Sequence, residues 1–171
     1  YLPLINTNVE QQMRDVIAGA AAKLDSVGGI IEYAAVGLPA GIGSPMFDGI
    51  ENRISQAVFG VPAVKGIEFG RGFDITRLTG FEANDNYYYD ENKNVRVKKN
   101  NNGGIVGGIT NGAPIIFRVA IKPTPSIFKT QDTINVKTKE NTALTLEGRH
   151  DSCIVPRAAA ALRFPARRRE P

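Results

Sequence analysis

Ile115-Ile116-Phe117-Arg118-Val119-Ala120-Ile121 carries the clearest strand pattern in the sequence. All of its odd-numbered residues are apolar. Because successive side chains of a strand point to opposite faces of the sheet, this alternation predicts a β-strand with one buried face. Ile67 and Phe69 alternate with small or polar residues in the same way, and they predict a second strand of this kind.

Two amphipathic helices are predicted before this strand. Thr7 and Glu10 have the spacing of a capping box, and apolar residues then recur at helical intervals until Gly28. Ser44 offers a second cap with proline at the first helical position, and the apolar face that follows ends at Gly60.

Further strands and one loop complete the prediction. Residues 29–37 have a strand-like composition bounded by glycines, and residues 133–138 and 142–146 predict a hairpin whose turn lies around Glu140 and Asn141. Residues 84–102 are polar apart from three tyrosines and predict a long exposed loop. Together these elements predict an α+β fold with helices packed on an antiparallel β-sheet.

The composition bounds the class of protein. A chain of 171 residues with 42% hydrophobic content suffices for one domain with a core. The net charge is +4, but residues 158–171 supply +3 of it, so residues 1–157 carry too little positive charge to favour a nucleic-acid partner. We therefore expect a folded domain over residues 1–157. Residues 158–171 form an atypical basic tail with no apolar period, expected to be disordered or an artefact of a frame error or cloning.

Cys153 is the only cysteine, so no disulfide can form within the chain, and a single thiol is typical of a reducing compartment. The chain has no apolar run of about 18 residues, and its start lacks the pattern of a secretory signal. A cytoplasmic protein without a membrane span is expected. No metal site is expected either, because one histidine and one cysteine cannot supply a zinc ligand set.

Glycines are concentrated between Asn101 and Gly112. Bare backbone at such positions permits either tight turns or the close approach of a ligand. The segment lacks the Gly-Lys-Ser/Thr ending of a Walker loop and the spacing of a dinucleotide fingerprint. The residues alone leave turns and ligand approach equally open.

Two later segments carry groups that suit an anion. Lys122-Pro123-Thr124-Pro125-Ser126 combines a cation with two hydroxyl donors on a chain stiffened by prolines, although strand-ending turns of this composition are common. Arg149-His150-Asp151-Ser152-Cys153 combines an arginine fork with a carboxylate. A surface Arg/Asp pair beside a solvated histidine is the simpler explanation of these five residues alone. Between residues 61 and 70, Lys65 and Glu68 are explained in the same way as a solvent pair.

Taken together and in order, five segments resemble the second half of chorismate synthases, namely Pro39–Asp48, Pro62–Gly70, Asn101–Gly112, Lys122–Ser126 and Gly148–Cys153. The resemblance covers nearly all of residues 28–157. It implies half of a β-α-β sandwich, in which helices lie between two antiparallel sheets, and assembly as a homotetramer. It also implies a carbon–oxygen lyase of the shikimate pathway, which converts 5-enolpyruvylshikimate 3-phosphate to chorismate by trans-1,4-elimination of phosphate and requires reduced FMN.

The resemblance also implies roles for individual residues. Pro62 and Ala63 match a turn that lines the flavin, and Gly107 matches a glycine against which the flavin lies. Arg149 matches an arginine at the flavin and substrate, and Asp151 matches an aspartate near the flavin N5 that helps proton transfer. The FMN-binding loop of the family is matched by Lys122, Pro123, Thr124, Pro125 and Ser126.

Several blocks of the family's first half do not occur in this sequence. They are a Gly-Glu-Ser-His-Gly-like segment, a second catalytic histidine, phosphate-binding arginines and a Ser-Ala-Arg block. His150, the single histidine, matches neither catalytic histidine of the family. We therefore expect the chain to be inactive alone. The alternative is a flavin-binding, phosphate-binding or oligomerisation module without catalysis.

Overall fold

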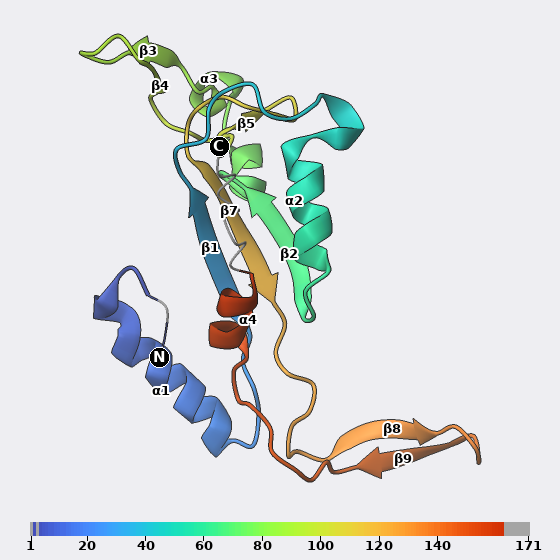
Figure 1. The fold of residues 1–171 in the computed structure, drawn as a ribbon. Helices are drawn as coiled ribbons and strands as arrows, with labels where there is room; N and C mark the ends of the chain where they lie inside the picture. Colours follow the sequence, from blue (N-terminus) through green and yellow to red (C-terminus); the bar gives the residue numbers. More distant parts are fainter. Residues whose placement is uncertain (1, 3, 163–171) are drawn as a thin grey trace, which may run out of the picture. The chain divides into compact units, whose positions relative to one another are not determined.

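The structure is a computed structural model that describes residue 2 and residues 4–162 (Figure 1). The chain divides into two compact units. The first unit combines Tyr1–Gly29 with Ile121–Pro171, and the second unit is Ile30–Ala120. The chain therefore leaves the first unit after Gly29 and returns to it at Ile121.

The second unit is built on a three-stranded sheet. Its strands are β1 (Gly29–Ala35), β2 (Val64–Phe69) and β7 (Ile115–Ile121), in the order β1-β7-β2. The arrow of β7 runs opposite to those of β1 and β2, so the sheet is antiparallel (Figure 1). The predicted alternation is confirmed, because the odd-numbered residues of β7 are buried and the even-numbered ones are not. Phe117 stacks on Tyr33 on the buried face, with ring centroids 5.1 Å apart.

Helix α2 (Ile50–Phe59) contacts β2. The predicted helix over residues 44–60 is confirmed only from Ile50, because a 3-10 turn, η2 (Met46–Asp48), precedes it and Gly49 is extended, with ψ 160°. A backbone contact explains the break. The Ile50 N–H donates to the Gly108 carbonyl at 2.9 Å, and a Cβ on Gly49 would lie 2.9 Å from the Gly108 Cα. The chain must open at Gly49 to let Gly108 approach.

Short elements make up the rest of the second unit: η3 (Gly72–Arg77), α3 (Gly80–Ala83), β3 (Tyr87–Tyr89), β4 (Val95–Val97), β5 (Ile105–Val106) and β6 (Ile109–Thr110). The exposure predicted for residues 84–102 is confirmed over most of the segment, but the prediction of a loop is wrong. Strands β3 and β4 pair as an antiparallel hairpin, and Asp85 and Asn101 are buried at its two ends. Asp85 accepts hydrogen bonds from the Asn101 N–H at 2.7 Å and from the Asn102 N–H and side-chain amide at 2.9 Å. This carboxylate closes the base of the hairpin.

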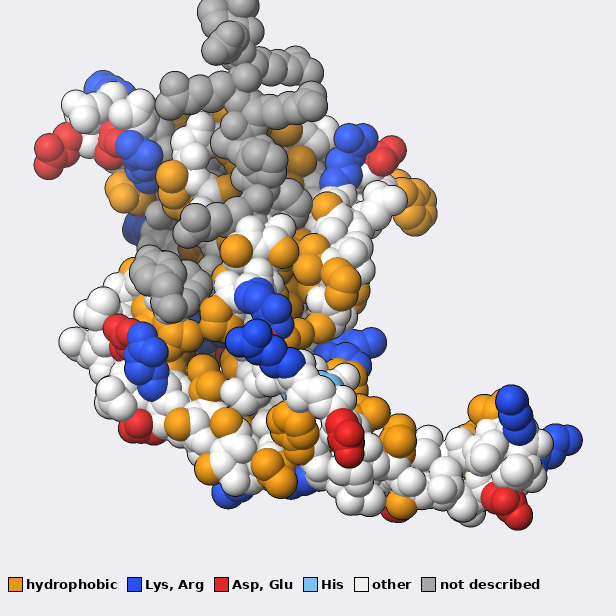
Figure 2. Space-filling view, turned by 60° about the horizontal axis from the view of Figure 1, so that its bottom comes forward, with side chains coloured by type: hydrophobic (Ala, Val, Ile, Leu, Met, Phe, Trp, Pro, Cys, Tyr) orange, Lys and Arg blue, Asp and Glu red, His pale blue; other side chains and the backbone are white. Residues whose placement is uncertain are grey.

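The first unit contains η1 (Thr7–Val9), α1 (Glu10–Ala22), β8 (Gln131–Asn135), β9 (Glu140–Leu144) and α4 (Val155–Ala161). The predicted first helix is confirmed over α1, but it ends at Ala22 rather than near Gly28. Asn6 rather than Thr7 caps the turn before it, by accepting from the Asn8 N–H at 3.0 Å. Much of the apolar face of α1 is exposed to solvent, and Val16, for example, is 55% exposed. Hydrophobic side chains also lie among charged ones on the face shown in Figure 2.

The predicted hairpin near the C-terminal end is confirmed as β8 and β9, but its turn lies at residues 136–139 rather than at Glu140 and Asn141. Asn135 sets this turn. Its side-chain Oδ1 accepts from the N–H groups of Lys137 and Thr138 at 3.0 and 3.2 Å, and its carbonyl accepts from the Lys139 N–H at 2.8 Å. Asparagine favours such turns because its side chain bonds the backbone two residues on.

Helix α4 corrects the expected boundary of the tail. The helix crosses from Arg157 into Ala158, and Ala158, Ala159 and Leu162 are buried, Leu162 to 2% exposure. Residues 158–162 are therefore part of the folded chain, and the basic-tail prediction for residues 163–171 lies outside the described residues. Within the described residues, no helix combines the length and hydrophobicity that crossing a bilayer requires.

Candidate functional site

Four of the five glycines of residues 101–112 separate into three packing glycines and one open glycine, whereas a Cβ on the fifth, Gly112, would make an ordinary contact of 3.7 Å with Ala40. A Cβ added to Gly103, Gly104 or Gly108 would lie 2.4 to 2.5 Å from a main-chain atom. At these three positions the main chain lies against the main chain of another segment, so there is no room for a side chain. Gly107, at φ +60°, begins the two-residue turn between β5 and β6, and a Cβ there would meet nothing within 4 Å. Gly107 alone of the four presents bare backbone to open space.

Pro62 and Ala63 lie in the second unit, in the turn between α2 and β2. Ala63 has φ +72°, a left-handed conformation that costs a non-glycine residue about 1 kcal/mol or more. Residues held in such conformations occur preferentially at functional sites. Pro62 is exposed on the same turn.

The Lys122–Ser126 segment follows β7 directly, in the first unit. Lys122 is half-buried, and among the described residues it has no ion-pair or hydrogen-bond partner. The Thr124 Oγ1 is buried and also lacks a partner in the described chain. A buried hydroxyl without a partner is unfavourable by about 1 to 3 kcal/mol, so this atom fits a site that a polar ligand completes.

The Arg149–Cys153 segment differs from the simple surface arrangement expected above. Asp151 pairs with Arg157 of α4, not with Arg149, and Arg149 is exposed without a partner in the described chain. His150 is not solvated. Its ring packs edge-on against Phe128, with centroids 4.8 Å apart, and its Nε2 is buried without a partner among the described residues.

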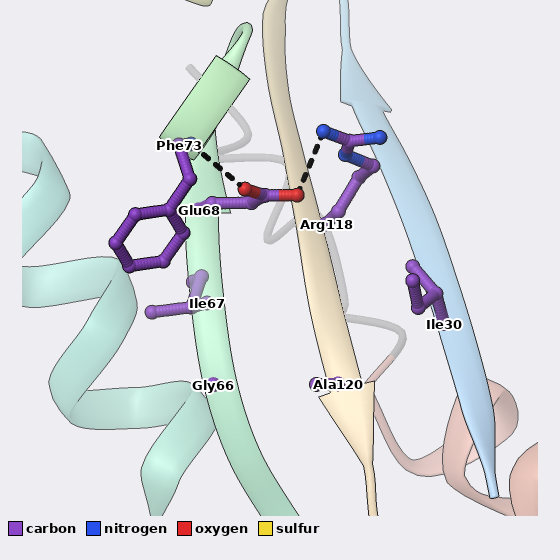
Figure 3. A pocket seen from close by; sticks show the side chains of 7 residues that line it. All are labelled: Ile30, Gly66, Ile67, Glu68, Phe73, Arg118 and Ala120. Atoms are coloured by element: carbon purple, nitrogen blue, oxygen red, sulfur yellow. Dashed lines mark hydrogen bonds and ion pairs between the residues drawn. The ribbon is translucent and has the colours of Figure 1, made fainter. Parts of the chain in front are cut away.

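A shallow pocket of about 220 Å³ lies on the second unit's sheet and contains none of the predicted site residues (Figure 3). Glu68 and Arg118 form an ion pair of 2.7 Å across β2 and β7, so Glu68 is not the solvent partner of Lys65 that the sequence suggested. The Phe73 N–H also donates to Glu68 at 3.1 Å. Seven residues line this pocket: Ile30, Gly66, Ile67, Glu68, Phe73, Arg118 and Ala120.

A family model described as chorismate synthase matches residues 1–164. The chain belongs to the chorismate synthase family. The match continues past Ala158, which agrees with the packed helix α4 and confirms that the tail was predicted to begin too early.

Relatives and one solved structure agree with this assignment. Chorismate synthases of Methanococcus maripaludis and Methanococcus aeolicus are 50% and 48% identical over 151 residues, and that of Dehalococcoides mccartyi is 47% identical over 152 residues. These alignments cover 88 to 89% of this chain but only 40 to 42% of each relative. A crystal structure of chorismate synthase matches with a TM-score of 0.65 and 38% identity, over 70% of this chain and 36% of that chain. The α+β fold of the family is thereby confirmed.

The residues predicted to form the site are divided between the two units. Pro62, Ala63 and Gly107 belong to the second unit, whereas Lys122–Ser126, Arg149 and Asp151 belong to the first. Among the described residues, no three His, Cys, Asp or Glu side chains come together as a metal site.

Sequence reasoning missed one part of the first unit that contacts both segments predicted to bind ligand, Lys122–Ser126 and Arg149–Cys153. Ser26 Oγ donates to the Thr124 carbonyl at 2.6 Å, and the Val27 N–H donates to the Ser152 carbonyl at 2.8 Å. Asp25 contacts Lys129 at 2.6 Å, and this hydrogen bond, with a second from the Ser26 N–H, holds the pKa of the Asp25 carboxyl below its usual value. The adjacent glycines Gly28 and Gly29 were the available signal.

Proposed function

We propose that the chain is the C-terminal half of a chorismate synthase that converts 5-enolpyruvylshikimate 3-phosphate to chorismate and phosphate. Family membership supports this activity. The observation that carries it is the Lys122–Ser126 segment, where an uncommitted ammonium lies two residues from the buried, unpartnered hydroxyl of Thr124. Such an arrangement suits an anionic ligand, because the cation supplies charge and the hydroxyl supplies a directed hydrogen bond.

The described residues fit the reduced FMN that the family requires. Pro62, Ala63 and Gly107 are the residues that would lie against the ring, and the open side of Gly107 leaves room for a flat group. Lys122, Thr124 and Ser126 would hold the cofactor, on a segment that Pro123 and Pro125 stiffen. When bound, reduced FMN supplies electron density that assists the loss of phosphate.

Arg149 and Asp151 have different tasks in this proposal. Arg149 is uncommitted in the described chain, so its guanidinium can bind an anionic oxygen of cofactor or substrate. Asp151 is the catalytic residue, which accepts or relays a proton. Its carboxylate pairs with Arg157 of α4 in this chain.

The complete enzyme is proposed to be a cytoplasmic homotetramer, as the family implies. This chain spans about two fifths of its curated relatives and lacks the histidine and arginine blocks of the family's first half. We therefore expect the chain alone to be inactive.

An anaerobic assay with substrate and chemically reduced FMN tests both statements. The full-length enzyme that contains these residues should form chorismate, and the isolated chain should not. A full-length enzyme without chorismate formation would refute the function, and chorismate from the isolated chain would refute its dependence on the rest. FMN affinity without turnover in the full-length enzyme would favour the binding-module alternative.

A further inference from the structure

Residues 25–28 belong to the loop between α1 and β1 (Figure 1), and three consecutive positions of it, Ser26 to Gly28, each lie against another part of the first unit. Ser26 holds the carbonyl of Thr124 through its hydroxyl at 2.6 Å. Val27 holds the carbonyl of Ser152 through its main-chain N–H at 2.8 Å. Thr124 is the residue whose own hydroxyl is buried without a partner, and Ser152 directly follows Asp151. One short loop therefore contacts both ligand segments of the first unit.

Gly28 lies close against the main chain on either side of Lys122. A Cβ at this position would lie 2.2 Å from the Ile121 carbonyl oxygen and 3.0 Å from the Pro123 nitrogen. Both neighbours are main-chain atoms, so no side-chain rotation could relieve the contact. Any residue other than glycine would therefore push the chain on either side of Lys122 out of place.

Lys129 adds a third attachment just beyond Ser126. Its ammonium lies 2.6 Å from the Asp25 carboxylate, with both side chains about half exposed. An exposed pair of this kind contributes little to stability, but it limits where the end of the segment can lie. The Lys122–Ser126 segment thus has a close main-chain neighbour at its start, a hydrogen bond at Thr124 and an ion pair just beyond its end.

We propose that residues 25–28 form a positioning element for the ligand's phosphate group, with Ser26 and Gly28 as its positioning residues. The element fixes the main chain of Lys122–Ser126 and its spacing from Ser152, and so from the neighbouring Asp151. This inference rests on the proposed function. Its physical basis is preorganisation, because a segment that is already ordered loses less conformational entropy when it binds.

Two variants and two matched controls test the element in the full-length enzyme. Ser26→Ala removes one hydrogen bond and should weaken FMN about 5-fold, and Gly28→Ala should weaken it by more, about 10-fold or beyond. Gly19→Ala is the control for glycine, because a Cβ there meets nothing within 4 Å. Ser55→Ala is the control for serine, because Ser55 makes no side-chain hydrogen bond in the described chain.

The affinity for riboflavin, which lacks the phosphate of FMN, distinguishes a positioning effect from a general loss of stability. Gly28→Ala should weaken FMN much more than riboflavin, whereas a variant that is only destabilised should lose both ligands alike. Hydrogen exchange at the Val27 amide provides a second measurement without ligand. Exchange should accelerate in Ser26→Ala and Gly28→Ala and stay unchanged in both controls.

Each result has a defined consequence. An enzyme that binds FMN normally in Gly28→Ala, or that loses FMN and riboflavin equally, overturns the positioning role and leaves the proposed function intact. An unsubstituted enzyme that binds no FMN overturns the proposed function and the inference with it. Unchanged Val27 exchange in both variants overturns the structural basis of the inference whatever the ligand data show.

Discussion

Replacing Asp85 by alanine should destabilise the second unit strongly. Asp85 is 5% exposed, and its carboxylate accepts three hydrogen bonds of 2.7 to 2.9 Å from Asn101 and Asn102. No cation pairs with it in the described chain, so these N–H donors are its whole compensation for burial. Asp85→Ala removes the acceptor and leaves two main-chain N–H groups without a partner.

The expected loss follows from these contacts. Hydrogen bonds to a charged group contribute about 1.5 to 3 kcal/mol each, and water entering the vacated space replaces part of that. We therefore expect Asp85→Ala to lower the free energy of unfolding by about 3 to 5 kcal/mol, near the upper end for single substitutions. Asp85→Asn keeps one acceptor oxygen but turns an amide donor toward other donors, so its loss should be smaller yet still measurable.

Urea unfolding followed by circular dichroism gives the change, with Asp74→Ala as the matched control. Asp74 is 53% exposed and only 3.6 Å from Arg77 in a surface pair, so its removal should change stability by less than about 0.5 kcal/mol. Hydrogen exchange at the Asn101 and Asn102 amides should accelerate in Asp85→Ala alone. Equal stability of the Asp85 and Asp74 variants would show that the carboxylate does not hold the hairpin.

Four further predictions concern the first unit. Lys122→Ala should weaken FMN in the full-length enzyme by about 1 to 3 kcal/mol, the range for a charge-assisted hydrogen bond, and an unchanged FMN titration would place the cofactor elsewhere. Asp151→Asn should lower turnover about 100-fold or more with little change in FMN affinity, and full turnover would reduce Asp151 to a structural residue. Leu162→Ala should lower the free energy of unfolding by about 2 to 5 kcal/mol because the side chain is buried, and a neutral result by thermal melting would return residue 162 to the tail. Asp25 should titrate below 3.8 by NMR, so its contribution to stability is complete above that pH and is lost on acidification through the lowered pKa, and Lys129→Ala should raise this pKa.

The sheet was predictable because its signal is local. Burial of one face requires apolar residues at every second position, and Ile115–Ile121 shows that spacing in the chain itself, with a shorter instance at Ile67 and Phe69. The hairpin base was not predictable in this way. Asp85 looks like any loop aspartate until the Asn101 N–H, 16 residues away, lies beside it. The start of helix α2 was not predictable either, because it depends on the contact of Gly49 and Ile50 with Gly108, which is distant in sequence.

The candidate site shows a similar division. Residues with exposed or unpaired chemistry, such as Lys122 and Arg149, could be named from their type and from the order of their segments. Ser26 could not be named in this way. Its hydroxyl donates to the main-chain carbonyl of Thr124, and every residue has such a carbonyl, so the sequence does not indicate the partner. His150 was expected in solvent, and only its packing on Phe128 corrects that expectation.

The strand order β1-β7-β2 also determines when the sheet can form during synthesis. In the described chain, β1 and β2 hydrogen-bond to β7 and not to each other, and β7 is the last of the three to leave the ribosome. Until Ile115–Ile121 emerges, both earlier strands have two unpaired edges. Because the pairing of β1 with β7 is also distant in sequence, its loop must close before any contact compensates. A nascent chain arrested before residue 115 should therefore be the species most prone to aggregate.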